Sequence, residues 1–258
     1  MLRILMAGLM IFAASGCTFG LPSAVDAAPF EARPAKAPFA DGEYCNTAAD
    51  EAGELMVQRP DEDNEDACAT FTWDASQRLF VMRDNLGKEG EFKLVALGDG
   101  FFMVQLPTTT DDDSPFSFLL MAAVVQGEAA VILPLSDGEA IVPFAARYPG
   151  LALSTYKPSR PPFTMPVAPE GGEPLPPEPD HFYISAGSPA EIHDFVRDIL
   201  RDWIRKDSVS RADEGRVWKG EGLIVRDQPA PADHAPSLVQ QRDIDALVAK
   251  LQAFAPSP

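Results

Sequence analysis

Between residues 41 and 150, short runs of β-forming residues alternate with turn residues, and this pattern constrains the fold more than any other feature of the chain. The runs at 69–73 and 78–82 are separated by four turn-forming residues, which is typical of a β-hairpin. Similar reasoning predicts the following further strands: 91–97 and 101–106 around Gly98-Asp99-Gly100, 116–125 and its partner after Gln126-Gly127, and the shorter 42–46, 53–58 and 140–144. About nine strands with short connections predict an antiparallel meander that curls into a barrel or a sandwich.

One of these strands is apolar on both of its alternating faces. Residues 116–125 read FSFLLMAAVV, with no charged side chain on either face. A strand in an antiparallel sheet that has one face in water shows a polar residue at every second position. We therefore expect 116–125 to be a central strand that is covered on both sides.

A different pattern follows residue 180 and predicts a helix that begins near Pro189. Ser188, Pro189 and Glu191 are spaced as in a capping box with a proline in the first turn. The apolar residues after them fall on one helical stripe, namely Ile192, Phe195, Val196, Ile199, Leu200, Trp203 and Ile204. This stripe is the expected core face of the helix.

The rest of the C-terminal part completes a small β-α-β-α region over residues 181–258. We expect a strand at 181–185, a strand or small hairpin within 216–227 and a last helix over 241–254. A unit of this size buries too little surface to be very stable alone, so it is expected to pack on the β body. The fold class is therefore α+β.

Nine prolines and a Gly-Gly pair lie within residues 157–179. No helix or central strand tolerates that composition. We interpret 154–180 as a Pro-rich linker between an antiparallel β domain at 41–153 and the C-terminal region. Alternatively, the Pro-rich run is a ligand for an aromatic groove on another protein.

The N-terminus has the layout of an export signal. Arg3 precedes an apolar run from Ile4 to Ala14 that is too short to span a bilayer as a helix. The next residues, Ala14-Ser15-Gly16-Cys17, resemble the lipobox of bacterial lipoproteins. The resemblance implies that residues 1–16 are removed and that acyl chains on Cys17 hold the protein on a membrane.

Two details of this segment bear on location. By the same resemblance, Thr18 after the cysteine implies the outer membrane, with the body facing the periplasm. Residues 17–40 are rich in Ala and Pro, and we interpret them as a tether that could extend up to ~60 Å. The alternatives are cleavage after Ala27, or a secreted protein that loses Cys17 with its signal.

The net charge of −18 limits the possible partners. It argues against nucleic acid and against binding to anionic lipid headgroups by charge. A protein partner or ligand should instead be basic, uncharged or apolar. If Cys17 is acylated, Cys45 and Cys68 form an even pair in an oxidising compartment, which predicts one disulfide. The alternative is two buried thiols.

The residues that usually perform catalysis or bind metal are few and isolated. His181, His193 and His234 lack partners at zinc-site spacing. Ser188 lies in a segment without the second glycine of a nucleophile elbow, so a helix cap explains it better. The acidic runs 61–66 and 111–113 lack the glycine and the closing acidic residue of a calcium loop. We therefore expect no catalytic residue, cofactor or metal.

These observations favour a non-catalytic lipoprotein of the cell envelope with a binding or structural role. The first alternative is a carrier of an apolar molecule in a cavity of the β body, since barrels of about eight strands hold one small ligand. The residues proposed to line that cavity are Phe71, Trp73, Phe92, Phe101 and Phe118. The second alternative is a hydrolase with a pair of carboxylates, which leaves no local motif.

Overall fold

The computed structural model describes residues 20–49, 55–58, 67–108, 115–133, 135, 138–156, 180–213, 223–226 and 241–254. Twelve strands of these segments form one sheet. In chain order the elements are β1 (Leu21–Ser23), η2 (Phe30–Ala32), β2 (Gly42–Ala49), β3 (Leu55–Val57), β4 (Cys68–Asp74), β5 (Leu79–Asp84), β6 (Glu89–Gly98), β7 (Phe101–Pro107), β8 (Phe118–Gln126), β9 (Ala129–Leu133), η3 (Glu139–Ile141), α1 (Val142–Ala145), β10 (Ala152–Tyr156), β11 (His181–Ala186), α2 (Pro189–Asp213), β12 (Leu223–Arg226) and α3 (Gln241–Phe254).

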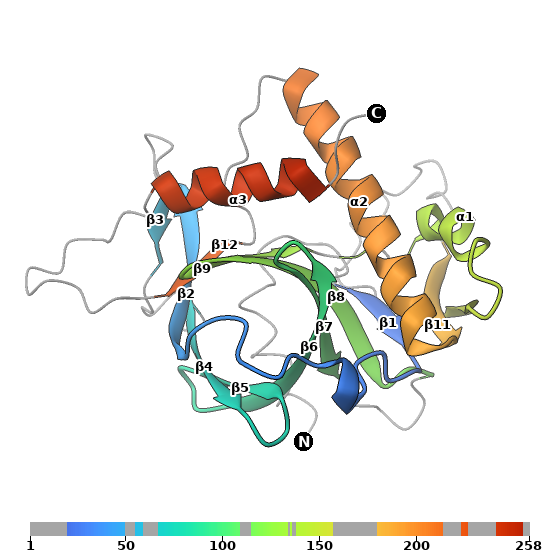
Figure 1. Ribbon diagram of the computed structural model, residues 1–258, viewed down its shortest axis with the longest axis horizontal. Helices are drawn as coiled ribbons and strands as arrows, with labels where there is room; N and C mark the ends of the chain where they lie inside the picture. The colour runs from blue at the N-terminus through green and yellow to red at the C-terminus, as the bar shows by residue number, and fades with distance from the viewer. Residues whose placement is uncertain are drawn as a thin grey trace, which may run out of the picture.

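Eight of these strands pair in a continuous ring, which Figure 1 shows from one end. The order around it is β8-β7-β6-β5-β4-β2-β12-β9, and β9 pairs again with β8. Every pairing in the ring is antiparallel. The sheet as a whole stays open, because it continues beyond β8 through β1 and β11 to an edge at β10. The prediction of a β-rich α+β fold is confirmed.

Strand β8 allows the ring and the open extension to share one sheet. Residues 118–120 pair with β1, while 122–126 of the same edge pair with β9. Strand β7 occupies the opposite edge. As its apolar pattern predicted, β8 is covered on both sides. Met121, Ala123 and Val125 face the inside of the ring, and Leu120, Ala122 and Val124 belong to the core on its outer side.

The helices cover the outside of the ring over β6, β8 and β9 (Figure 1). The helix α2 has the predicted core stripe, and Phe195, Val196 and Leu200 are fully buried. Its predicted cap is confirmed, because the Ser188 N–H donates a hydrogen bond to the Glu191 carboxylate and the Glu191 N–H donates one to the Ser188 hydroxyl. Helix α3 packs the Phe254 ring on Phe101 at a centroid distance of 3.9 Å. None of the described helices has the length and apolar content needed to span a membrane.

The predicted hairpins form as β4–β5, β6–β7 and β8–β9. In the second turn Gly98 and Gly100 have positive φ, as glycine readily does, and Asp99 between them has a left-handed φ of 53°, which a short polar side chain tolerates. One expected strand is wrong. Residues 140–144 lie in η3 and α1, because Pro143 stands in the first turn of the helix, where its missing N–H costs no bond.

The tether expected over 17–40 is wrong for residues 20–40, which we call the arm. Strand β1 pairs with β8 and with β11, and Leu21, Ala27 and Ala28 are fully buried. The Ala and Pro content indicated an extended chain, which is correct. It did not show that the extended chain has apolar side chains that pack on the sheet.

The domain boundaries also differ from the prediction. Strand β10 begins at Ala152 and extends into the expected linker. Strands β11 and β12 belong to the same sheet as the β body, and β12 lies between β2 and β9 in the ring. Residues 181–258 are therefore not a separate unit, because their described strands pair with strands of the N-terminal half.

The predicted disulfide is confirmed. Cys45 and Cys68 are opposite each other on the paired strands β2 and β4, and their sulfur atoms are bonded. Both are buried on the outer side of the ring. The bond therefore joins two strands of the ring wall without entering its interior.

Candidate apolar-ligand site

The inside of the ring contains a cavity, and every described residue that lines it is apolar or aromatic. Measured together with the solvent at its mouth, the cavity has a volume of about 560 Å³. Its described lining residues are Phe39, Tyr44, Phe71, Met82, Phe92, Leu94, Val104, Leu106, Met121, Ala123, Val125, Ala130, Ile132 and Ile224. The strand period of two places all but Phe39 there, since every second residue of a ring strand faces inward. None of these residues is charged.

Aromatic rings form the wall on the β4–β6 side of the cavity. Phe71 and Phe92 meet edge to face with centroids 5.5 Å apart. Phe80 stacks on Phe92 at 5.3 Å, and Trp73 leans on Phe80 at 5.0 Å. Such contacts hold flat rings in fixed orientations, so this wall is a rigid apolar surface.

Tyr44 supplies the one polar atom at the boundary of the cavity. Its ring lies inside, 5.3 Å from that of Phe71, and its hydroxyl donates a hydrogen bond of 3.0 Å to the carbonyl of Ala40. Burial raises the pKa of Tyr44 to about 12, and the nearby Glu128 and Asp41 carboxylates act in the same direction against Arg226. The hydroxyl therefore stays protonated, and the cavity remains uncharged.

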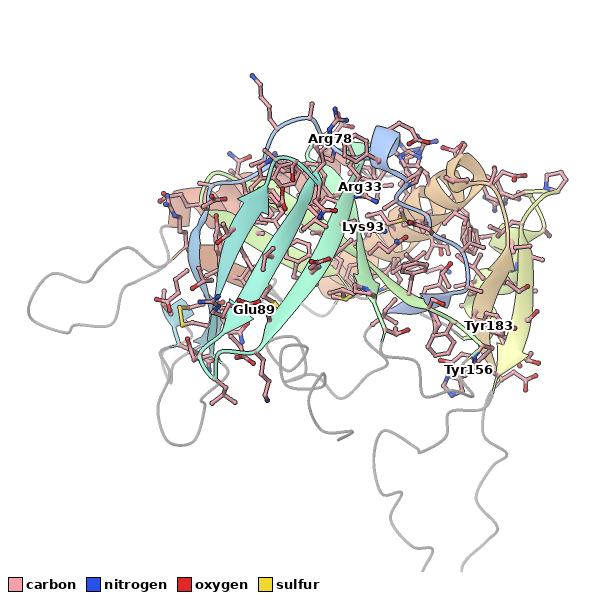
Figure 2. All side chains as sticks on the ribbon, turned by 90° about the horizontal axis from the view of Figure 1, so that it is seen from below. Arg33, Arg78, Glu89, Lys93, Tyr156 and Tyr183 are labelled. Atoms are coloured by element: carbon pink, nitrogen blue, oxygen red, sulfur yellow. A yellow bond between two sulfur atoms is a disulfide. The ribbon has the colours of Figure 1, made fainter. Side chains whose placement is uncertain are left out.

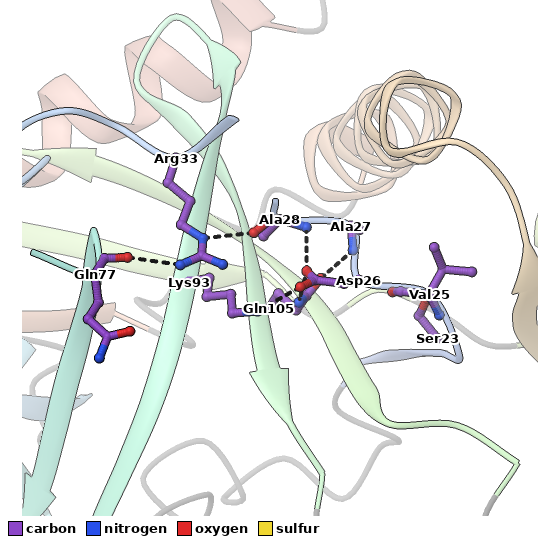
Figure 3. A network of polar contacts seen from close by, with 9 residues as sticks. All are labelled: Ser23, Val25, Asp26, Ala27, Ala28, Arg33, Gln77, Lys93 and Gln105. Carbon is purple, nitrogen blue, oxygen red and sulfur yellow. Dashed lines mark hydrogen bonds and ion pairs between the residues drawn. The ribbon is translucent and has the colours of Figure 1, made fainter. Parts of the chain in front are cut away.

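The arm is fixed to the outside of β6 and β7 by a polar network centred on Asp26 (Figure 3). Asp26 accepts hydrogen bonds from the Gln105 side chain at 2.7 Å and the Ala28 N–H at 3.0 Å, and it pairs with Lys93 at 2.9 Å. The Gln105 side chain is fully buried and also accepts a 2.7 Å bond from the Ala27 N–H.

This network sets the charge state of Asp26. Partial burial acts to raise the pKa of Asp26, but the hydrogen bonds from Lys93, Gln105 and Ala28 outweigh it and lower the pKa below its usual 3.8. Asp26 is therefore ionised at neutral pH, as its pairing with Lys93 requires.

Beyond the network the arm turns over one end of the ring, where it is held at two points. Arg33 donates to the carbonyls of Ala28 and Gln77, each at 2.8 Å. Asp41 accepts a bond of 2.9 Å from the Trp73 N–H. Figure 2 shows Arg33 and Arg78 at this end of the ring strands and Glu89 at the other. Between the two points, Phe39 reaches into the cavity.

The structure confirms part of the predicted cavity lining. Phe71 and Phe92 line the cavity, and Trp73 packs against the same apolar cluster. The prediction is wrong for Phe101 and Phe118, which do not line the cavity. Phe101 lies on the outer face under α3, and Phe118 stands 5.4 Å from the Lys93 ammonium outside the ring. The strand alternation could have excluded Phe101, because its neighbour Phe102 shares the inward parity of Val104 and Leu106.

The other sequence candidates have structural roles or lie elsewhere. His193 bonds to the Ala96 carbonyl at 2.7 Å, His181 packs on the Tyr156 ring, and Ser188 caps α2. The described segments contain no group of His, Cys, Asp and Glu side chains that could hold a metal ion. Outside the described residues lie the signal with Cys17, His234, the acidic runs 61–66 and 111–113, and residues 157–179 of the linker.

Comparison with protein-family models, with curated proteins and with solved structures finds no match for this chain.

Replacing Gln105 tests the network. In Gln105→Leu the buried Ala27 N–H loses its acceptor and Asp26 loses a donor, so we expect a loss of about 2 kcal/mol in the free energy of unfolding. The measurement is urea unfolding followed by tryptophan fluorescence. The control is Gln77→Leu, because Gln77 contributes only its backbone carbonyl and its side chain is exposed. Equal stability of the two variants would contradict the role given to Gln105.

The lowered pKa of Asp26 predicts a pH dependence with a definite sign. The stability that Asp26 adds is present above its unfolded pKa of 3.8 and is lost as the pH falls through the lower folded value. The difference in unfolding free energy between wild type and Asp26→Asn should therefore be constant above about pH 5 and shrink below about pH 4. Urea unfolding at a series of pH values measures it. A difference that grows on acidification would reject the assignment.

Proposed function

We propose that this protein is a non-catalytic binding protein of the bacterial cell envelope that holds a small apolar molecule inside its ring. The observation that supports this is the cavity inside the ring, whose described lining residues are all apolar or aromatic. Sites for small molecules are lined mostly by side chains of this kind. Space against an apolar wall costs stability, because the lining atoms lack contacts, and a bound molecule would supply them.

The lining defines the chemical class of the ligand. None of the described lining residues is charged, and the Tyr44 hydroxyl is already bonded to Ala40. A charged or strongly polar group inside would lose its hydration without finding partners. The ligand is therefore an apolar molecule, or the apolar part of a larger one. This was the first alternative from the sequence, and the cavity makes it the leading proposal.

The proposed cellular location rests on the lipobox resemblance. Acyl chains on Cys17 would anchor the protein to the outer membrane, with its body facing the periplasm. Gly20 lies against β8, where a side chain at this position would collide with Leu119. Gly20 is three positions after Cys17, so the two α-carbons can be at most about 11 Å apart. The ring would thus sit next to the bilayer, which is itself a store of apolar molecules.

A fluorescent apolar probe tests binding. We expect N-phenyl-1-naphthylamine to bind one per protein with increased emission, because the cavity removes it from water. The substitution Ala123→Phe adds a ring to the cavity wall and should weaken binding about tenfold or more. Thr72→Phe is the control, because Thr72 is exposed on the outer face of β4. Absence of binding by the wild type, or equal binding by both variants, would overturn the proposal.

Intact-mass analysis tests the proposed membrane anchor separately from ligand binding. The protein isolated from membranes of the native host should begin at Cys17 and be heavier than its sequence by the mass of its acyl chains. Replacing Cys17 by Ser should release the protein from the membrane fraction. A native chain that begins after Ala27, or at Cys17 without acyl chains, would contradict the anchor.

A further inference from the structure

We propose that Phe39 is the gate of the cavity and that residues 34–40, which we call the lid, move aside to let the ligand pass. This inference rests on the proposed function, because a gate requires a ligand.

The first observation is the origin of the lining residues. Thirteen of the fourteen lie on strands of the ring, and Phe39 alone comes from outside it. Each ring strand is hydrogen-bonded on both edges, so moving a wall residue out of the way would break the sheet. Phe39 is the only described lining residue that can leave without breaking a strand pairing.

The second observation is the position of Phe39. Its ring stacks on Phe80 at a centroid distance of 4.1 Å and meets Tyr44 and Phe71 edge to face at 5.5 and 6.0 Å. It is only partly buried, so one side faces the cavity while the other reaches solvent. A side chain at the boundary between a cavity and water controls passage between them.

The third observation is how weakly the lid is attached. No hydrogen bond between backbone groups joins residues 34–40 to any described residue, and Pro34 and Pro38 have no N–H to donate. Among the described residues, the one polar contact of the lid is the hydrogen bond that the Tyr44 hydroxyl donates to the Ala40 carbonyl. The neighbouring residues Arg33 and Asp41 are fixed to the β4–β5 hairpin. The lid is therefore a short segment with two fixed ends, and Figure 1 shows this part of the arm crossing one end of the ring.

Opening the lid needs only local changes. Rotating Phe39 outward separates three ring contacts and one hydrogen bond, while the ring and the network at Asp26 stay intact. Local motions of this kind draw on the least stable part of a structure, which is where segments without backbone bonds belong.

Binding kinetics separate a gate from an ordinary wall residue. For N-phenyl-1-naphthylamine in a stopped-flow fluorimeter, we expect Phe39→Ala to raise both the association and the dissociation rate constants about fivefold or more, with a smaller change in affinity. Phe30→Ala is the matched control. Phe30 is a phenylalanine of the same arm, is 46% exposed and lies outside the cavity lining, so its removal should leave both rates unchanged.

A second variant guards against a folding defect in the first. Tyr44→Phe keeps the aromatic ring and removes only the hydroxyl that holds Ala40, so it should raise the association rate in the same direction by a smaller factor.

The outcomes are distinct. If Phe39→Ala raises only the dissociation rate, Phe39 is a wall contact and the gate is wrong. If the wild type binds and neither variant changes the association rate, the gate is wrong while the binding function stands. If no form binds the probe, the binding function is wrong and the gate with it.

Discussion

The pairing of β12 between β2 and β9 is the constraint on which the rest of the structure depends. Four residues near the C-terminus fill the gap in a ring whose other strands come from residues 42–133. Without them β2 and β9 would have unpaired edges, and Ile224 would be missing from the cavity wall. Because this contact joins residues far apart in the sequence, it has a high entropic cost and should form late in folding.

Separate packing of the two faces explains how the ring can keep space inside. The outer face of β6–β9 is covered by α2, α3 and the arm, and residues such as Leu120, Phe195 and Leu247 are fully buried there. Much of the stability of the sheet can thus come from the outer core. The inner face then has only to remain apolar, and the aromatic contacts of Phe71, Phe80 and Phe92 keep it rigid. A single-core domain of this size would need its interior filled.

The sequence predicted what is local and missed what is distant. The hairpins, the Ser188 cap and the stripe on α2 follow from neighbouring residues, and the disulfide follows from the two cysteines that remain when Cys17 is set aside. The place of β12 in the ring has no local signature, because three apolar residues followed by an arginine fit many sheet edges. The alternation along β7 did contain the signal that Phe101 faces outward. Phe39, however, lies among Ala and Pro residues and shows no pattern that would connect it with Phe80 about forty positions later.

The arm joins the proposed anchor to the gate through one chain, and the network at Asp26 decides whether the two are coupled. A pull on Gly20 is transmitted to β1, which is paired with β8 and β11, and then to Asp26 and Ala27, which are bonded to Gln105. Arg33 fixes the arm once more before the lid begins. The pairing with β8 and the bonds to Gln105 and Gln77 join the arm to the ring itself, so a displacement at the proposed anchor would move the whole ring and leave Phe39 where it is. On this proposal the lid responds to the ligand and to its contacts with Phe80 and Tyr44, and the anchor would position the ring without opening it.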